Sequence, residues 1–246
     1  MPAKPTVTST RDTFRTDDIA GLSNPEKLRA PHICGARKFC YAHRMGLRER
    51  KKAQTHAALS WAAVRLTVER GFDKVKVEDI AEAAGVSPRT FNNYFSSKAE
   101  AIAFRHLDRC LRVADEVRER PGEPLWDAIT GSVLRQFAPD AEAIAHPPVA
   151  DAAQWTEGVR VMIAEPALRG EMLRAGAAAE AEIAAAVAER TGGDLEQDLY
   201  PHLVASAVMG AVNTAIAHHL RTDAAVPVSR LLTDALARIA AGLSTP

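Results

Sequence analysis

The stretch "GVSPRTFNNYFSSK" (85–98) decides the predicted fold, because it combines aromatic side chains typical of a core with many hydrogen-bonding side chains at helical spacing. Ser87 is a preferred N-cap and Pro88 a preferred first helical residue, so a helix is expected to begin there and run to about Tyr94. At about 100° per residue, Phe91 and Phe95 share one face, and we expect them to pack on Ile80 and Trp61. The stretch therefore predicts a short helix with an aromatic inner face and a polar outer face.

The polar face of this helix carries groups that suit DNA. Arg89 and Asn93 point away from the phenylalanines, Thr90 and Tyr94 line one flank, and Asn92 stands on the other. Guanidinium and amide groups match base edges in a major groove, and hydroxyls match the phosphate backbone. From the residues alone, the alternative is a solvated helix over a small core.

A second helix precedes this one. The segment "VEDIAEAAG" (77–85) has acids in its first turn, apolar residues on one face and Gly85 at its end. Two helices joined by a glycine-containing turn, the second carrying the polar groups, form a helix-turn-helix arrangement. The sequence thus predicts a DNA-binding motif at about 76–95.

The rest of the chain also has helical periodicity and no strand pattern. A first helix is expected from Arg48 to Gly71, and another from near Ser97. After the loop "ERPGEP" (119–124), helices are expected at about 125–138, 150–164, 167–191, 196–221 and 227–243. The predicted fold class is all-α, with a three-helix helix-turn-helix head and a helical-bundle body.

The net charge of zero hides a division along the chain. Residues 1–47 carry +4, residues 48–98 carry +4 and residues 99–246 carry −8, with no lysine after Lys98. A basic front half joined to an acidic back half indicates that only the front contacts a polyanion.

The composition predicts a cytoplasmic protein with no membrane partner. It is 47% hydrophobic and 25% charged, and its three cysteines suit a reducing compartment. The apolar run at 203–217 contains Asn213 and Thr214, so we interpret it as a bundle or interface helix rather than a membrane span.

Residues 1–47 are expected to form a disordered extension, and Met45 is an alternative start for the chain. The histidines and cysteines of "HICGARKFCYAH" (32–43) fit no common zinc spacing, so no metal site is predicted. The sequence has no GxSxG, P-loop or HExxH motif, so we expect neither an enzyme nor a cofactor.

Residues from about 50 to 110 resemble the N-terminal domain of the TetR family of transcriptional regulators. The resemblance rests on "GF", "VEDIAEAAGVS" and "TF..YF.SK" at the family's spacing. It implies a DNA-binding head at 48–110 and a body at 111–246 that binds a small-molecule inducer and dimerises. A homodimer would present two recognition helices to a pseudo-palindromic double-stranded DNA operator.

The resemblance also implies roles for individual residues. It places Thr90, Tyr94 and Lys98 on phosphates, and it directs Pro88, Arg89, Asn92 and Asn93 toward the groove. Lys76 stands where the family typically has threonine, so the helix loses a side-chain cap while the ammonium keeps a phosphate contact. Asn92 stands where the family often has an aromatic residue. From their charge, and not from the resemblance, Arg48 and Lys51 are expected on the DNA backbone, with a solvated basic terminus as the alternative.

The body offers weaker candidates. Bulky residues that would line an inducer pocket, with ordinary core as the alternative, are Trp126, Phe137, Trp155, Met162 and Met172. The stretch "VRVMIAEPALRGEMLRA" (159–175) resembles actinobacterial TetR-like regulators that sense acyl-CoA or other lipid-like molecules. A dimer interface on the last two helices is expected to use Ala205, Val208, Ala211, Val212, Leu232, Leu236 and Ile239.

Together these features predict a ligand-responsive repressor of the TetR type. The alternative is an all-helical small-molecule-binding protein without specific DNA binding.

Overall fold

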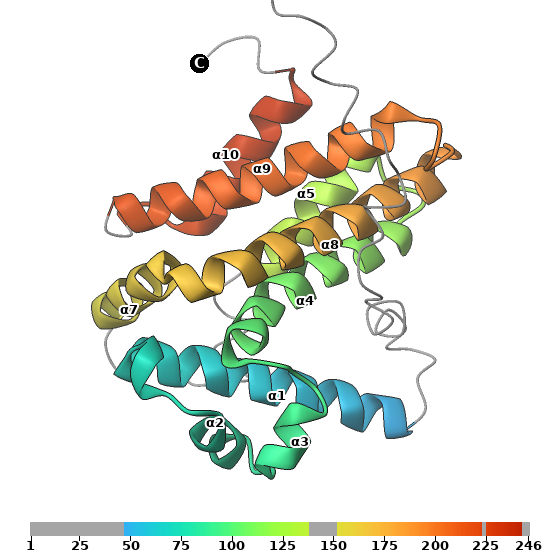
Figure 1. Ribbon diagram of the computed structural model, residues 1–246. Coiled ribbons are helices and arrows are strands. Elements are labelled where there is room, and N and C mark those ends of the chain that lie inside the picture. Colours follow the sequence, from blue (N-terminus) through green and yellow to red (C-terminus); the bar gives the residue numbers. More distant parts are fainter. Residues whose placement is uncertain (1–46, 138–151, 223–224, 243–246) are drawn as a thin grey trace, which may run out of the picture. The chain divides into compact units, whose positions relative to one another are not determined.

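The computed structural model describes residues 47–137, 152–222 and 225–242, and every regular element in these ranges is a helix (Figure 1). The all-α prediction is therefore confirmed. The predicted N-terminal extension, including the His and Cys residues at 32–43, lies outside the described residues.

The first helices form a small head. They are α1 (Leu47–Arg70), the short 3-10 helix η4 (Phe72–Lys74), α2 (Val77–Ala83) and α3 (Pro88–Asn92). α1 ends before Gly71, whose φ of 88° is one that glycine adopts at little cost. α3 ends at Asn92, earlier than the predicted Tyr94, and the chain then turns into the next helix.

A long helix, α4 (Lys98–Arg118), leads from the head to the remaining helices (Figure 1). Its first turns contribute Ala99, Ala101, Ile102 and Ala103 to the head core, and its last turns contribute Val113 and Val117 to the body core. The predicted boundary between residues 110 and 111 falls inside this helix. The body contains α5 (Leu125–Gln136), α7 (Ala152–Ala164), α8 (Pro166–Thr191), α9 (Leu199–Arg221) and α10 (Val228–Ala240).

Two apolar cores account for the packing. The head core includes Ile80, Phe91 and Phe95, as predicted, but Trp61 is not part of it. The guanidinium carbon of Arg105 instead lies over the Trp61 ring, 5.3 Å from the centroid of that ring. The body core is formed by aliphatic side chains of α4, α5, α8, α9 and α10, among them Ile129, Ile183, Val208, Leu232 and Leu236.

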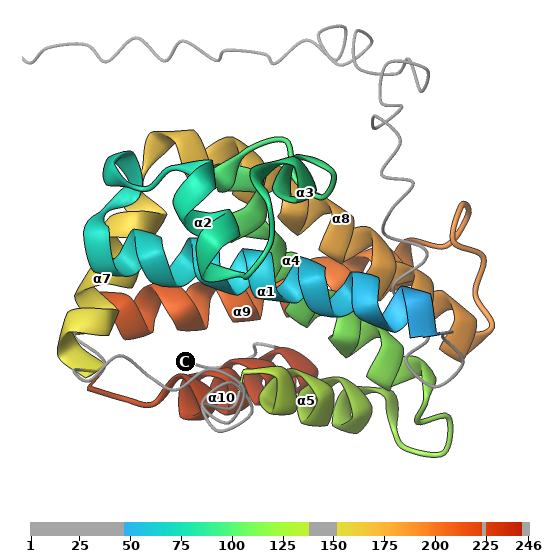
Figure 2. The same ribbon diagram turned by 90° about the horizontal axis from the view of Figure 1, so that it is seen from below.

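The prediction that these residues of the last two helices form a dimer interface is wrong, because their side chains face the chain's own core. Ala205, Val208, Ala211, Val212, Leu232 and Leu236 are all buried within the single chain, because α10 packs on α5 and α9 (Figure 2). Ile239 also packs against this core. The small apolar residues at helical spacing therefore mark the inner face of α9 and α10, not a surface for a second copy.

Helix α9 is long and apolar enough to cross a membrane by length and composition alone. Eight of its residues are nevertheless buried, and α9 packs against α8 and α10. The prediction of a bundle helix describes this packing, and α9 ends at the predicted residue 221 but begins at Leu199 rather than at about 196.

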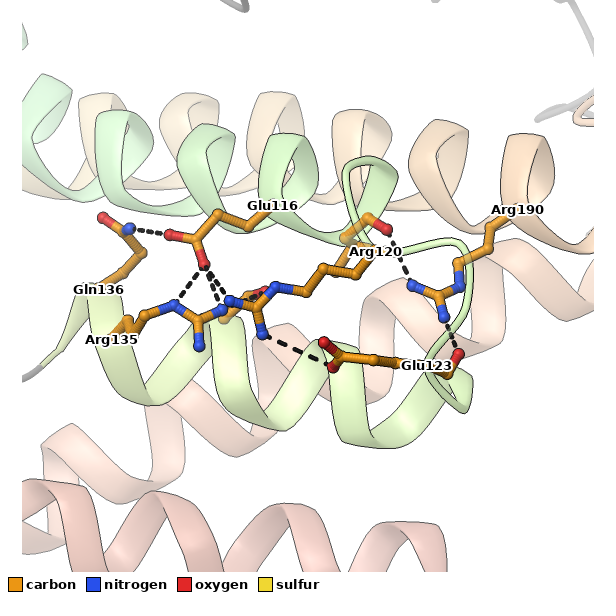
Figure 3. A network of polar contacts seen from close by, with 8 residues as sticks. Glu116, Arg120, Glu123, Arg135, Gln136 and Arg190 are labelled. Carbon is orange, nitrogen blue, oxygen red and sulfur yellow. Dashed lines mark hydrogen bonds and ion pairs between the residues drawn. The ribbon is translucent and has the colours of Figure 1, made fainter.

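Polar contacts hold the C-terminal end of α4 to α5 and α8 (Figure 3). Glu116 accepts hydrogen bonds from Arg135 and Gln136 of α5. Arg190 of α8 donates to the carbonyl of Val117 at 2.9 Å and to the carbonyl of Glu123. The last carbonyls of a helix lack intrahelical partners, so Arg190 satisfies the Val117 carbonyl that α4 leaves open and also ties the Glu123 loop to α8.

Arg118 adds a second tie between the same helices. Its guanidinium lies 2.9 Å from Glu189 and 3.4 Å from Glu182, both on α8. Partly exposed ion pairs of this kind contribute less than about 1 kcal/mol each. Their main consequence is geometric, because they fix the end of α4 that lies away from the head.

Helix α7 approaches α1 closely at Gly158. A Cβ atom on this residue would lie 2.5 Å from Val68 Cγ1 and 2.8 Å from the Val68 carbonyl oxygen. Two residues later, Arg160 donates to the Leu220 carbonyl near the end of α9, at 2.6 and 3.1 Å. Helix α7 thus contacts the head on one side and α9 on the other.

We predict that Gly158→Ala lowers the free energy of unfolding by about 1–3 kcal/mol, because the new methyl group must displace Val68 and its backbone. Urea denaturation measures the change. Gly176→Ala in α8 is the control, since a Cβ there meets nothing within 4 Å. It should raise stability by about 0.5–1 kcal/mol through helix propensity. Equal effects of the two substitutions would contradict the close approach.

Candidate nucleic-acid interface

Helix α3 is short, and its start is fixed by local hydrogen bonds. Ser87 Oγ accepts the backbone N–H of Thr90 at 3.1 Å and lies 2.9 Å from the Thr90 hydroxyl, with Pro88 in the first turn. The preceding turn uses Gly85, whose φ is 69°. The predicted N-cap, first helical residue and turn glycine are therefore confirmed.

The inner face of α3 is held by aromatic packing. Phe91 is 0% exposed and Phe95 2%, with ring centroids 5.7 Å apart. Phe95 also stacks on His56 of α1 at 4.4 Å and meets the edge of Phe104 of α4 at 5.6 Å. This cluster joins α1, α3 and α4, so the outer face of α3 has a defined direction.

The outer face presents the residues predicted to read bases. Pro88, Arg89, Asn92 and Asn93 are all exposed. Thr90 is half-buried, and its hydroxyl contacts Ser87. The structure thus leaves the guanidinium and the two amides accessible to a groove.

A basic hollow of about 400 Å³ lies between the start of α1 and the end of α3. Its lining brings Tyr94 together with Arg48 and Lys51, three residues predicted to contact the DNA backbone. Lys52 and Thr55 also line it, with Glu49 as the acidic member. Sequence reasoning did not include Thr55, although the spacing of 48, 51, 52 and 55 places these residues on one helix face.

Lys76 precedes α2 and is exposed. Its side chain has no acceptor, so it cannot cap the helix, as predicted. Asp79, three residues on, instead accepts the backbone N–H of Lys76 at 2.8 Å. This contact holds the start of α2 while the Lys76 ammonium remains exposed.

Lys98 has partners within the protein. Its Nζ donates to the carbonyls of Phe72 at 2.5 Å and Val75 at 3.0 Å, and it lies 4.0 Å from the centroid of the Phe72 ring. An ammonium has three N–H donors, so two are used inside the head. The resemblance implied a phosphate contact, and the structure differs by directing this ammonium to the chain's own backbone.

The predicted inducer residues do not gather at one place. Trp126 and Phe137 pack with the body core, while Met162 and Met172 pack with the head core. The side chain of Trp155 lies outside the described residues. The four described residues therefore serve as core, which was the stated alternative.

A second hollow, of about 610 Å³, lies between α5 and α10 and contains none of the predicted residues. It is lined by Leu134, Ser229, Arg230, Thr233, Asp234 and Ala237. Among the residues that the structure describes, no group of three His, Cys, Asp or Glu side chains could hold a metal ion.

Two half-buried histidines, His56 and His106, stay neutral near physiological pH. Burial, followed by the positive charge of Lys52, lowers the pKa of His56 from 6.5 to about 4. Burial, followed by Arg109, lowers the pKa of His106 to about 4 as well. His56 stacks on Phe95 in the aromatic cluster that holds α3, so a charge on His56 would affect the packing of that helix.

We therefore predict that stability falls as the pH drops from 6.5 toward 4. Above pH 6.5 both histidines are neutral in the folded and unfolded states and contribute no pH dependence. Each histidine has a pKa of 6.5 in the unfolded chain and of about 4 in the folded protein. Between these two pH values the unfolded chain binds a proton that the folded protein does not, so each histidine lowers the free energy of unfolding by up to about 3 kcal/mol. Urea denaturation between pH 7.5 and 5.5 measures the slope. The variant His56→Phe, which retains an aromatic ring, should have a shallower slope, and an unchanged slope would contradict the assignment.

Comparison with known proteins supports one family. Residues 61–102 match the model for bacterial regulatory proteins of the tetR family, and residues 123–244 match the MftR C-terminal domain. The HTH-type transcriptional regulator TcmR of Streptomyces glaucescens is 32% identical over 185 residues, which are 72% of this chain and 79% of TcmR. MftR of Mycobacterium tuberculosis, a regulator assigned to mycofactocin biosynthesis, is 31% identical over 199 residues, or 79% of this chain and 93% of MftR.

Solved structures agree at the level of the fold. The fatty acid degradation regulator FadR of Bacillus halodurans has a TM-score of 0.50 at 16% identity, covering 78% of this chain and 97% of FadR. A TetR-family regulator from Rhodococcus sp. has a TM-score of 0.50 at 21% identity, covering 78% of this chain and all of that one. The chain belongs to the TetR family of DNA-binding transcriptional regulators, as its similarity to TcmR and MftR, its head motif and the exposed polar face of α3 together show.

Proposed function

We propose that the protein is a homodimeric repressor that binds a pseudo-palindromic operator through residues 48–110 and releases it when a small molecule binds residues 111–246. The observation that carries this proposal is the position of the exposed polar face of α3 next to the basic hollow. Tyr94 lies two residues after the end of α3 and lines that hollow with Arg48 and Lys51.

The two surfaces suit different parts of DNA. Arg89, Asn92 and Asn93 offer donors and acceptors for base edges in the major groove. Arg48 and Lys51, with Tyr94, offer two positive charges and a hydroxyl for phosphates, and the exposed ammonium of Lys76 and the hydroxyl of Thr90 extend this set. The charge of −8 on residues 99–246 disfavours DNA contact by the body.

For the dimer we propose the exposed face at the start of α9. Leu199, Tyr200 and Leu203 are 69%, 50% and 56% exposed, and their spacing places them on one side of the helix. Large apolar side chains grouped at a surface are typical of interaction sites. A second copy placing the same face against this one would form an isologous contact, as a twofold dimer requires.

For the inducer we propose a lipid-like molecule such as an acyl-CoA. The proposal is supported by the resemblance of residues 159–175 to regulators that sense such molecules. In the same stretch Val161, Ile163 and Leu173 are 58%, 39% and 76% exposed, so it carries apolar surface that an acyl chain would cover.

The test of the operator proposal is a gel shift with the DNA flanking the protein's own gene, at low and high salt. Specific binding should appear at about 10⁻⁸ M protein or below and weaken steeply as salt rises. Arg89→Ala should cost about 1–3 kcal/mol on the operator and relax preference at one base position.

Arg70→Ala, at the exposed end of α1 away from α3, is the matched control and should leave base preference unchanged. Unaltered discrimination by Arg89→Ala would remove this residue as a base reader. The absence of any salt-sensitive shift would favour the alternative, a helical small-molecule-binding protein without specific DNA binding.

The dimer proposal predicts that Leu203→Glu converts the protein to a monomer, because burying two added carboxylates at a symmetric contact is unfavourable. Light scattering after size-exclusion chromatography measures the mass. Leu173→Glu adds the same charge at an exposed site on α8 and should leave the dimer intact. A dimeric Leu203→Glu variant would contradict the proposed face.

A further inference from the structure

Lys98 occupies an unfavourable place for a cation. It is the first residue of α4, directly after the N-cap Ser97. The start of a helix carries partial positive charge, so a lysine there is destabilised unless another contact compensates. The carbonyls of Phe72 and Val75 supply that contact at 2.5 and 3.0 Å, together with the Phe72 ring.

The segment that Lys98 contacts has weak bonds of its own. Residues 72–75 connect α1 to α2, and their internal backbone bonds are long, at 3.3 Å for Lys74 N–H to Gly71 O and 3.4 Å for Val75 N–H to Phe72 O. The ammonium of Lys98 adds two bonds from a residue more than twenty positions later in the chain. The position of this segment therefore depends on the bonds from α4 as well as on the burial of Val75 in the head core.

The start of α4 is itself well fixed. Ser97 Oγ accepts the backbone N–H of Glu100 at 3.0 Å. The Glu100 carboxylate in turn accepts the backbone N–H and the hydroxyl of Ser96, each at 2.7 Å. Because Ala99 and Ile102 are buried in the head core, Lys98 projects from a rigid base.

We propose that Lys98 is a positioning residue for DNA recognition rather than a phosphate contact. Val75 directly precedes Lys76, the N-cap of α2, so the bond from Lys98 to the Val75 carbonyl sets where α2 begins. α2 packs against α3, and its start carries the exposed ammonium of Lys76. Lys98 thus holds the helix-turn-helix motif in place against α4, so that Lys76 and Arg89 can contact the operator at the same time. This inference rests on the proposed function.

The test uses Lys98→Met, which keeps an unbranched apolar side chain and removes the ammonium that lies over Phe72. In the free protein, amide hydrogen exchange should accelerate at residues 72–80 and stay unchanged in α8. At a temperature where the variant is fully folded, its operator affinity should fall about tenfold, as expected for lost bonds to a charged group. Its affinity for non-operator DNA and the salt slope of binding should match the wild type.

Lys51→Met is the matched control, because Lys51 lies in the basic hollow. It should weaken operator and non-operator DNA alike and lower the salt slope by about 0.9, the value for one phosphate contact. If Lys98→Met behaves in the same way, with exchange at 72–80 unchanged, the inference is overturned. If the wild type itself binds no operator, the proposed function fails, while the exchange result still decides whether Lys98 holds the segment.

Discussion

The burial of Phe91 and Phe95 is the contact on which the DNA-binding surface depends. A helix as short as α3 is not stable alone, because the cost of nucleating a helix exceeds what one turn returns. Ser87 and Pro88 favour its start, but the two rings supply the apolar burial that holds it against α1 and α4. The direction of Arg89 toward solvent follows from the direction of these rings toward the core.

The same cluster connects the motif to the body. Phe95 and His56 contact Phe104, which lies on α4, and α4 continues without a break to the ties at Arg118 and Arg190. Helix α7 gives a second connection through its close approach to α1 at Gly158. Under the proposed mechanism, a ligand that favours one arrangement of the body shifts the population of head positions through these two helices.

Much of this could be predicted from local sequence rules. Capping at Ser87, the glycine at 85 and the spacing of Phe91 and Phe95 depend on neighbours in the chain, and the structure has each of them as expected. Partners distant in sequence could not be predicted in this way. The carbonyls that Lys98 contacts are more than twenty residues away, and apolar spacing alone could not tell whether Val208 and Leu236 face the chain's own core or a second copy. Bulky residues such as Phe137 and Met162 presented the same ambiguity, and both proved to be core.

The most direct test of the account is amide hydrogen exchange of the full chain with and without its operator DNA. If the outer face of α3 and the basic hollow form the interface, the operator should slow exchange at residues 88–94 and 48–55, with little change in α5 and α8. Protection confined to the body, or none in the head at a DNA concentration that saturates the gel shift, would contradict the assignment of the DNA-binding surface.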